Sequence, residues 1–243
     1  MGRDLYLTVI LPMHNEEKRI SQCVERVAEA CSQITGSYEI IIAEDGSRDA
    51  TPQLAAKLVR ESPKHVRHQH SPHKLGRGAA LTLALRSARG KYAAYMDADL
   101  SSSLKFLKRL IHGVEAGAAI STGSRLMPSS HTHRPALRDV FSRGYNTLVR
   151  TLLGSKLYDH QCGFKAFDLA QVLPLLDEVE DTHWFWDTEM LVRAQKKGLR
   201  VDEFPIVWTQ NSPDSKVRLR SDVFYMGRKI LDLKRKLMLR RSH

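Results

Sequence analysis

The sequence predicts an α/β protein, with a mostly parallel β-sheet and helices on both faces of that sheet. Short apolar runs alternate along the first half of the chain with segments of helical period, and this order is typical of a parallel sheet. Acidic or small residues follow several of the apolar runs. They lie at the carboxyl ends of the expected strands, where such sheets bind their ligands.

Apolar periodicity and the residues that bound each run define the elements of the first half. The first run ends at Pro12, and Ile20, Val24 and Val27 then recur at helical spacing. Pro52 lies in the first turn of another expected helix, a position that proline favours. The predicted strands are 5–11, 38–43, 65–70, 91–96 and 118–123, and the predicted helices are 17–34, 49–60, 76–89 and 103–116.

The second half is less regular. Residues 126–135 are polar and are expected to be mobile, whereas 137–153 and 187–197 read as helices and 163–168 and 200–208 as extended segments. We find no internal repeat and no long linker. The prediction is therefore one domain over residues 1–220, followed by a C-terminal helix within residues 221–243.

Composition excludes several classes of protein and indicates an anionic partner. No apolar run approaches the roughly 20 residues of a membrane-spanning helix. The three cysteines show no zinc spacing and favour a reducing cytosol. The formal net charge is +11, and residues 216–243 carry ten Lys or Arg against Asp222 and Asp232. Such a segment suits membrane lipid, lipid phosphate or nucleic acid.

Two aspartates, Asp97 and Asp99, follow the apolar run 91–96. Alternate residues of an extended segment point the same way, so both carboxylates can converge on one target. Hard oxygen ligands at a strand end suit Mg²⁺ or Mn²⁺ shared with a diphosphate. The alternative is a solvated turn, in which aspartate is common.

Other strand ends fit a nucleotide. Glu16 follows the first strand and Asp45 the second, where they would accept hydrogen bonds from a base or ribose. Each residue also has an alternative, structural interpretation. Glu16 would be a carboxylate favoured at the start of a helix, and Asp45 would belong to an ordinary Asp-Gly turn. Lys74, Gly76 and Gly78 supply a cation and two glycines at a helix start, which suits a phosphate or a base edge. This segment lacks the Gly-Lys-Ser/Thr ending of a Walker loop.

Taken together, the ordered segments resemble the inverting nucleotide-sugar glycosyltransferases of family 2, which have the GT-A fold. The most similar subgroup transfers sugars to polyprenyl or dolichyl phosphate. The stretches around Gln161-Cys162-Gly163 and Trp184-x-x-Asp187 look more like dolichyl-phosphate β-glucosyltransferases than mannosyltransferases. The resemblance covers about residues 5–218, and its segments are 9–16, 44–47, 74–78, 97–99, 123–125, 159–167, 184–191, 203–208 and 215–216.

The resemblance implies a role for each matching residue. The implied donor is a nucleotide diphosphate sugar of the UDP-glucose or GDP-mannose type, and the implied cofactor is Mg²⁺ or Mn²⁺ held by Asp97 and Asp99. The nucleotide-binding residues would be Pro12, Asn15, Glu16, Asp45, Lys74, Gly76, Asp97 and Ala98. The catalytic residues would be Asp99, Arg125, Arg138, Asp187 and Lys216. The acceptor site would be formed by Arg125, Arg138, Ser142, Gln161, Trp184 and Lys216.

Three other functions remain open, and one of them is a non-catalytic nucleotide-binding relative. Asp187 aligns with the general base of relatives that glycosylate hydroxyl groups, whereas a phosphate acceptor is already anionic and needs no base. A basic nucleic-acid-binding protein without enzymatic activity would fit the isoelectric point of 9.7. The acidic strand ends argue against it, because they would repel nucleic-acid phosphates. We therefore expect no nucleic-acid partner and make no prediction of oligomeric state.

Residues 222–241 predict a basic amphipathic helix. Met226, Ile230, Leu233 and Leu237 lie near one stripe, with basic side chains beside it. Such a helix can lie in a membrane interface, or it can pack on its own domain or a second subunit. Because a polyprenyl phosphate is met at a bilayer surface, we expect a cytoplasmic protein, peripheral on the cytosolic face of a membrane.

Overall fold

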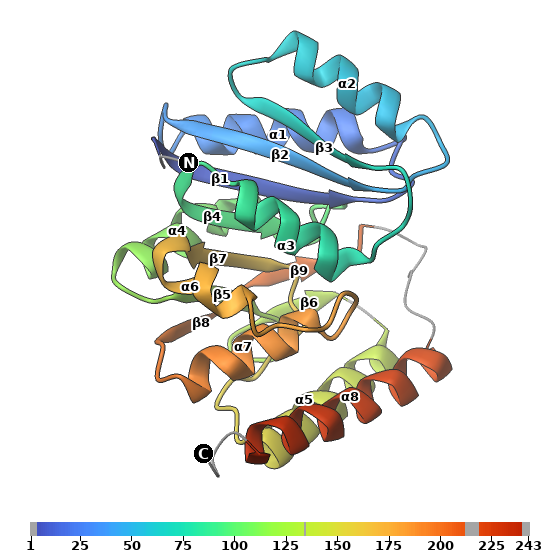
Figure 1. The fold of residues 1–243 in the computed structure, drawn as a ribbon, viewed down its shortest axis with the longest axis vertical. Helices are drawn as coiled ribbons and strands as arrows, with labels where there is room; N and C mark the ends of the chain where they lie inside the picture. The colour runs from blue at the N-terminus through green and yellow to red at the C-terminus, as the bar shows by residue number, and fades with distance from the viewer. Residues whose placement is uncertain (1–3, 134, 212–218, 240–243) are drawn as a thin grey trace.

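A computed structural model of the protein describes residues 4–133, 135–211 and 219–239, and its centre is a large sheet with helices on both faces (Figure 1). In these residues the sheet has seven strands in the order β3-β2-β1-β4-β7-β5-β8. Its strands are β1 Leu5–Met13, β2 Tyr38–Asp45, β3 Val66–Ser71, β4 Gly90–Met96, β5 Ile120–Ser124, β7 Phe164–Asp168 and β8 Val201–Pro205. Strands β6 His131–His133 and β9 Val207–Thr209 form a small second sheet.

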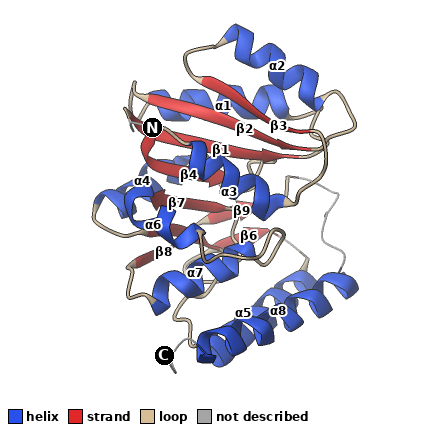
Figure 2. Ribbon diagram, in the orientation of Figure 1, coloured by secondary structure: helices blue, strands red, loops and turns tan. Residues whose placement is uncertain are grey.

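Helices cover both faces of the large sheet, as the sequence predicts (Figure 2). Helices α1, α2 and α4 share one core cluster with the strands, and α3, α6 and α7 share another. Strand β2 contributes side chains to both core clusters, because successive residues point to opposite faces of the sheet. Ile40 and Ile42 belong to the first cluster, and Ile41 and Ala43 belong to the second. The helices are α1 Ile20–Ser32, α2 Thr51–Glu61, α3 Arg77–Ser87, α4 Leu107–Glu115, α5 Ala136–Leu153, α6 Leu169–Leu176, α7 Trp186–Lys196 and α8 Leu219–Leu239.

The sheet is mostly parallel, with one exception that shapes the site. Strand β7 lies between β4 and β5 and runs antiparallel to both. Its first residue, Phe164, pairs with Met96, the last residue of β4. The residues just before β7 therefore lie beside the carboxyl ends of β4 and β5, so the second half of the chain reaches the ligand-binding edge of the sheet.

The structure corrects the predicted course of the chain in four places, and one of them is helix α6 Leu169–Leu176, which was not predicted. Strand β1 continues through Pro12 to Met13, because its pairing with β4 ends at Ile10 and a proline can occupy a position paired on one side only. The segment expected to be mobile contains β6, which pairs with β9. The single strand expected over 200–208 is divided at Ile206 into β8 and β9, and these belong to different sheets.

Helices α5 and α8 pack side by side at one end of the molecule (Figure 1). Ile230 and Leu233 of α8 are buried with Val149 and Leu153 of α5 and with Phe185. The apolar stripe predicted from the sequence is thus a packing surface of the protein itself. None of the described helices is both long enough and apolar enough to cross a bilayer.

Candidate functional site

The turn after β4 holds Asp97 and Asp99 in a fixed geometry. The Asp97 N–H donates to the Gly163 carbonyl at 3.2 Å, and the Leu100 N–H donates to the Asp97 carbonyl at 3.0 Å. Leu100 has a φ of +48°, a left-handed conformation that closes the turn. A Cβ on Gly163 would lie 2.0 Å from Asp97 Oδ2, so a larger residue before β7 would force the Asp97 carboxylate out of its position.

The two carboxylates fit a divalent ion that is shared with a substrate. Mg²⁺ is typically held by one or two carboxylates together with substrate phosphates and water. The Asp97 side chain is 46% exposed, and Asp99 is partly exposed. Asp99 Oδ1 accepts the Ser101 N–H at 3.0 Å, which orients this carboxylate without enclosing it. The pair therefore provides an accessible set of hard oxygen ligands.

The ends of β1 and β2 are joined by hydrogen bonds from the predicted nucleotide-binding residues. The Asn15 N–H donates to Ser47 Oγ at 2.9 Å, and the Glu16 N–H donates to Thr51 Oγ1 at 2.8 Å. Asn15 Oδ1 accepts the Arg48 N–H at 2.8 Å. These contacts bring the loop after Pro12 against the loop after β2, as a nucleoside site at neighbouring strand ends requires.

Asp45 has a structural partner that the sequence does not reveal. Its Oδ1 accepts the Leu75 N–H at 2.6 Å, and its Oδ2 accepts the Gly76 N–H at 2.9 Å. Gly76 has a φ of +109°, and a Cβ there would lie 2.2 Å from His183 Nδ1. Asp45 thus fixes the segment that carries Lys74 and Gly76 at the start of α3. A direct contact of Asp45 with the nucleoside remains a prediction.

Arg77 connects the turn that holds Asp97 and Asp99 to the predicted base, and sequence analysis did not assign it a role. Its Nη2 donates to Asp97 Oδ1 at 2.9 Å, and its Nη1 donates to Asp187 Oδ2 at 2.7 Å. The guanidinium also lies 5.7 Å from the centre of the Trp184 ring. Arg77 belongs to the glycine-rich segment 74–78, where its position between two glycines was the available signal.

Asp187 is enclosed by cationic and hydroxyl groups. Its other oxygen, Oδ1, accepts the Tyr95 hydroxyl and lies 3.1 Å from Lys165 Nζ. The residue is only 2% exposed. Burial alone would raise the pKa of Asp187, but the charges of Lys165 and Arg77 outweigh burial and hold that pKa below its ordinary value. Asp187 is therefore a weak base whose two oxygens are both engaged.

Lys165 is a fully buried cation in strand β7. Besides Asp187, its Nζ donates to the Cys162 carbonyl at 2.6 Å and to the His160 carbonyl at 3.3 Å. Sequence reasoning did not assign Lys165 a role, although a lysine within the apolar stretch 164–167 was a signal, since buried lysines are rare unless paired.

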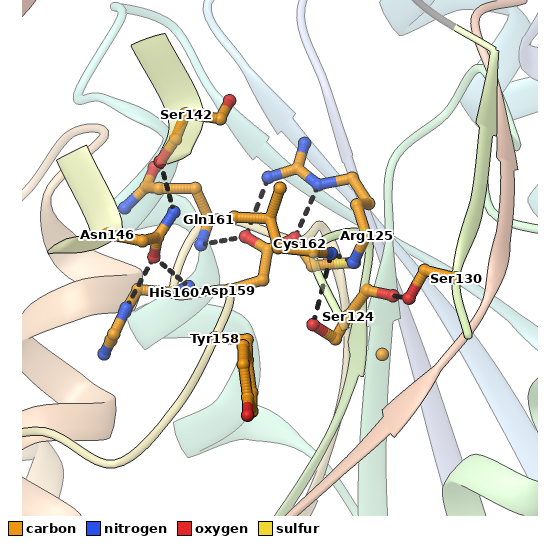
Figure 3. A network of polar contacts seen from close by, with 12 residues as sticks. Ser124, Arg125, Ser130, Ser142, Asn146, Tyr158, Asp159, His160, Gln161 and Cys162 are labelled. Atoms are coloured by element: carbon orange, nitrogen blue, oxygen red, sulfur yellow. Dashed lines mark hydrogen bonds and ion pairs between the residues drawn. The ribbon is translucent and has the colours of Figure 1, made fainter. Parts of the chain in front are cut away.

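Arg125, which is predicted to bind the acceptor, is tied to a third residue that sequence analysis did not assign a role, Asp159 (Figure 3). Its Nε and Nη2 donate to the two Asp159 oxygens at 2.7 and 2.9 Å, and its backbone N–H donates to Oδ2 at 3.0 Å. Burial would raise the pKa of Asp159, but the Arg125 charge and hydrogen bonds hold it well below its ordinary value. This pair anchors the loop after β5 to the segment that precedes β7.

The two predicted acceptor arginines approach the same short segment. The Arg125 guanidinium lies 6.0 Å from the centre of the Trp208 ring, and Arg138 Nη1 donates to Gln210 Oε1 at 3.2 Å. The next residue, Asn211, donates through Nδ2 to the carbonyls of Asp99 and Leu100, each at 3.1 Å. Residues 208–211 therefore connect both arginines to the turn that holds Asp97 and Asp99.

The remaining predicted acceptor residues lie around this region. Gln161 Nε2 donates to Thr188 Oγ1 at 2.7 Å, next to Asp187 in sequence. The Ser142 carbonyl accepts from Asn146 Nδ2 at 2.8 Å, which ties α5 to His160 through the same asparagine (Figure 3). Trp184 is partly buried against Arg77. Lys216 lies outside the described residues.

Comparison with known proteins identifies similar sequences. The family model for Glycosyl transferase family 2 matches residues 8–171. The chain is 46% identical over 228 residues to glycosyltransferase AglD of Haloferax volcanii, and the match covers 93% of this chain but only 36% of that protein. It is 34% identical over 208 residues to polyprenol monophosphomannose synthase of Mycolicibacterium smegmatis, a match that covers 83% of this chain and 77% of that enzyme.

A solved structure shares the fold. Glucosyl-3-phosphoglycerate synthase from Mycobacterium tuberculosis, crystallised with Mn²⁺, UDP and glucosyl-3-phosphoglycerate, superposes with a TM-score of 0.66. The match covers 95% of this chain and 78% of that one, at 17% identity. The similarity confirms the predicted GT-A type of α/β fold.

Proposed function

The chain belongs to glycosyl transferase family 2, and from that premise we propose that it transfers a sugar from a nucleotide diphosphate sugar to a polyprenyl phosphate, with inversion at the anomeric carbon. The name of the mycobacterial relative supports a polyprenyl acceptor. Because the chain spans only 36% of the Haloferax relative, the activity of that whole protein is not carried over.

The observation that carries the choice of acceptor is the state of Asp187. A hydroxyl acceptor needs a base to remove its proton, and an efficient base has a pKa near the working pH. Asp187 is buried, bonded on both oxygens and has a lowered pKa. A phosphate monoester is already anionic near neutral pH, so it can attack the anomeric carbon without such a base.

The chain's own residues supply the remaining requirements of the reaction. Asp97 and Asp99 would hold Mg²⁺ or Mn²⁺, which neutralises charge on the departing nucleoside diphosphate. Arg77 holds Asp97 in place, and the loop 74–76 lies at a helix start that suits an anion. Arg125 and Arg138 would orient the acceptor phosphate, because the planar guanidinium matches phosphate oxygens.

Arg138 offers the clearest test of this function. We expect the purified protein to convert a polyprenyl phosphate and UDP-glucose or GDP-mannose to a lipid-linked sugar that mass spectrometry detects. In Arg138→Ala we expect the KM for the lipid phosphate to rise by at least about tenfold, because hydrogen bonds to charged groups contribute about 1.5–3 kcal/mol. The KM for the nucleotide sugar should remain within about twofold, well under the roughly 1.4 kcal/mol that a tenfold change represents.

Arg143→Ala is the matched control, because Arg143 lies on the same helix and is paired with Asp139 at the surface. Its kinetics should match those of the unmodified protein. Transfer to a free hydroxyl acceptor, with no requirement for lipid phosphate, would contradict the proposal. Equal acceptor KM values for the Arg138 and Arg143 variants would remove Arg138 from the acceptor site.

We also propose that the α5–α8 pair contacts the cytosolic surface of a membrane. Most of the large exposed apolar side chains among the described residues lie on these helices: Leu137, Val140, Phe141 and Leu148 on α5, and Phe224, Leu231, Met238 and Leu239 on α8. Arg228 of α8 is exposed beside them. By contrast, Lys229 and Lys236 pair with Asp181 and Glu180, and so fasten α8 to the domain. The three buried free thiols are compatible with a reducing cytosol.

Binding to liposomes should depend on the exposed apolar side chains. We expect Phe224→Ser with Leu231→Ser to weaken binding to anionic liposomes at least about tenfold, since burying one such side chain contributes about 1.5–3 kcal/mol. Sedimentation at increasing salt would also show weaker binding, because each basic residue near an anionic surface contributes about 1 kcal/mol. Leu83→Ser is the control, since Leu83 is also an exposed apolar side chain but lies on α3. Equal sedimentation of both variants would exclude this surface.

A further inference from the structure

A second group of metal-ligating side chains lies at the carboxyl ends of β2 and β3. Glu44 of β2 pairs in register with His70 of β3, and Ile42 pairs with His68. Alternation along each strand places Glu44, His68 and His70 on the same face as Ile42 and Val66, which pack with α1 and α2. Asp45 points to the other face, toward the start of α3. The group is therefore separate from the predicted Asp97 and Asp99 site.

The three side chains are close enough to converge on one ion. His70 Nδ1 lies 2.5 Å from Glu44 Oε2, and His68 Nε2 lies 4.0 Å from the same oxygen. One ligand atom from each residue lies within 4.8 Å of the others. In the described part of the chain, no other group of three or more His, Cys, Asp or Glu side chains has this spacing.

Two features indicate that a ligand belongs between these side chains. His68 Nε2 is buried and has no hydrogen-bond partner among the described residues, and 4.0 Å is too long for a hydrogen bond to Glu44. A buried polar atom without a partner is unfavourable. Glu44 is almost fully buried, and its Oε1 accepts the Ser47 N–H. That bond leaves Oε2 directed at the histidines, because a hydrogen bond to one carboxylate oxygen orients the other.

We propose that Glu44, His68 and His70 bind a Zn²⁺ ion. Two imidazole nitrogens and one carboxylate oxygen form a ligand set typical of zinc, with a fourth position left to water. Mg²⁺ prefers oxygen ligands alone, so this group selects a different ion from the aspartate pair. To bind the ion through Nδ1, the neutral His70 imidazole would carry its proton on Nε2.

The bound ion would fasten the edge strand β3 to β2. Strand β3 leads into the segment 72–76, whose last residues are held by Asp45. Zinc would thus act as a structural clamp beside the nucleotide loop. This inference does not depend on the acceptor or on the sugar that the enzyme uses.

The test uses the full chain without a polyhistidine tag, freed of metal with EDTA and then titrated with Zn²⁺ against a chromophoric chelator. We expect one tight equivalent and a higher melting temperature with zinc. In His70→Ala, binding should weaken by more than about 100-fold, since loss of a residue that only hydrogen-bonds to a metal ligand already weakens binding by about 10–100-fold. His70 is about half exposed, so this variant should fold, and Glu44→Gln provides a second variant that keeps an acceptor for the Ser47 N–H.

Two controls identify the source of any binding. His112→Ala removes an exposed histidine of α4 and should bind zinc normally. Asp99→Asn should keep the tight equivalent, because Asp99 is not in the group. If the unmodified protein binds zinc no more tightly than His70→Ala, then Glu44 and His70 form an ion pair only, and the proposal fails. Loss of the tight equivalent in Asp99→Asn but not in His70→Ala would also overturn it.

Discussion

Asp99→Asn is expected to reduce sugar transfer by about 10²–10³-fold, because removing one electrostatic stabiliser of a transition state typically has an effect of that size. Asparagine keeps an oxygen that can accept the Ser101 N–H, so the turn after β4 should retain its conformation. What the variant loses is one negative charge at the expected metal site. The measurement is kcat at saturating substrates, together with the Mn²⁺ concentration that gives half-maximal activity.

The matched control is Asp202→Asn. Asp202 lies near the start of β8, away from the carboxyl ends of the strands, and it pairs with Arg109. Its replacement should leave kcat and the Mn²⁺ requirement unchanged. A folded Asp99→Asn protein that retains near-normal turnover in EDTA would refute the metal role of Asp99. Circular dichroism of each variant separates loss of the ion from loss of the fold.

The strand ends could be predicted because their signals are local. Asp97 and Asp99 follow an apolar run directly, and parallel strands bring such ends to one edge. The position of β7 could not be predicted in the same way, because the short stretch 164–168 does not encode its neighbours. Its insertion between β4 and β5 brings Gly163 against Asp97 and determines which later residues reach the site.

The sequence also does not predict which side chains pair when they lie far apart in the chain. Arg77 and Asp187 are 110 residues apart, and the sequence does not show that one guanidinium joins Asp187 to Asp97. Arg125 and Asp159, which are 34 residues apart, form a second such pair, in which a residue predicted to bind the acceptor also anchors a loop. The family resemblance indicated which segments matter, but the direction of each side chain follows from packing.

Trp184 and Trp186 show how packing decides between two equal alternatives. The sequence allows either residue to be a core residue or a wall of the acceptor site. Trp186 is fully buried in a core cluster, and its Nε1 donates to Thr82 Oγ1 at 2.9 Å. Trp184 stays partly exposed and stacks near Arg77. Of the two tryptophans, only Trp184 therefore remains a predicted acceptor residue.

Asp187→Asn is expected to lower the free energy of unfolding by about 3–5 kcal/mol, because removing one partner of a buried ion pair leaves an uncompensated charge. The charge left behind is that of Lys165, which is fully buried, and Arg77 keeps only Asp97 as an anionic partner. Denaturation with urea measures the loss. Asp177→Asn is the control, since Asp177 pairs with Arg86 at the surface, where such a pair contributes about 0–1 kcal/mol.

Adding Lys165→Met to Asp187→Asn should restore much of the lost stability, because the second change removes the unpaired buried cation. This double variant tests, in a protein that still folds, whether Asp187 acts as a catalytic base. If Asp187 were the base for a hydroxyl acceptor, its loss should reduce kcat by about 10²–10⁴-fold. With a phosphate acceptor we expect a smaller loss, caused by the weaker restraint on Arg77 and Asp97. A stable double variant that binds the donor normally but transfers no sugar would show that Asp187 acts chemically, and the acceptor would then be a hydroxyl group.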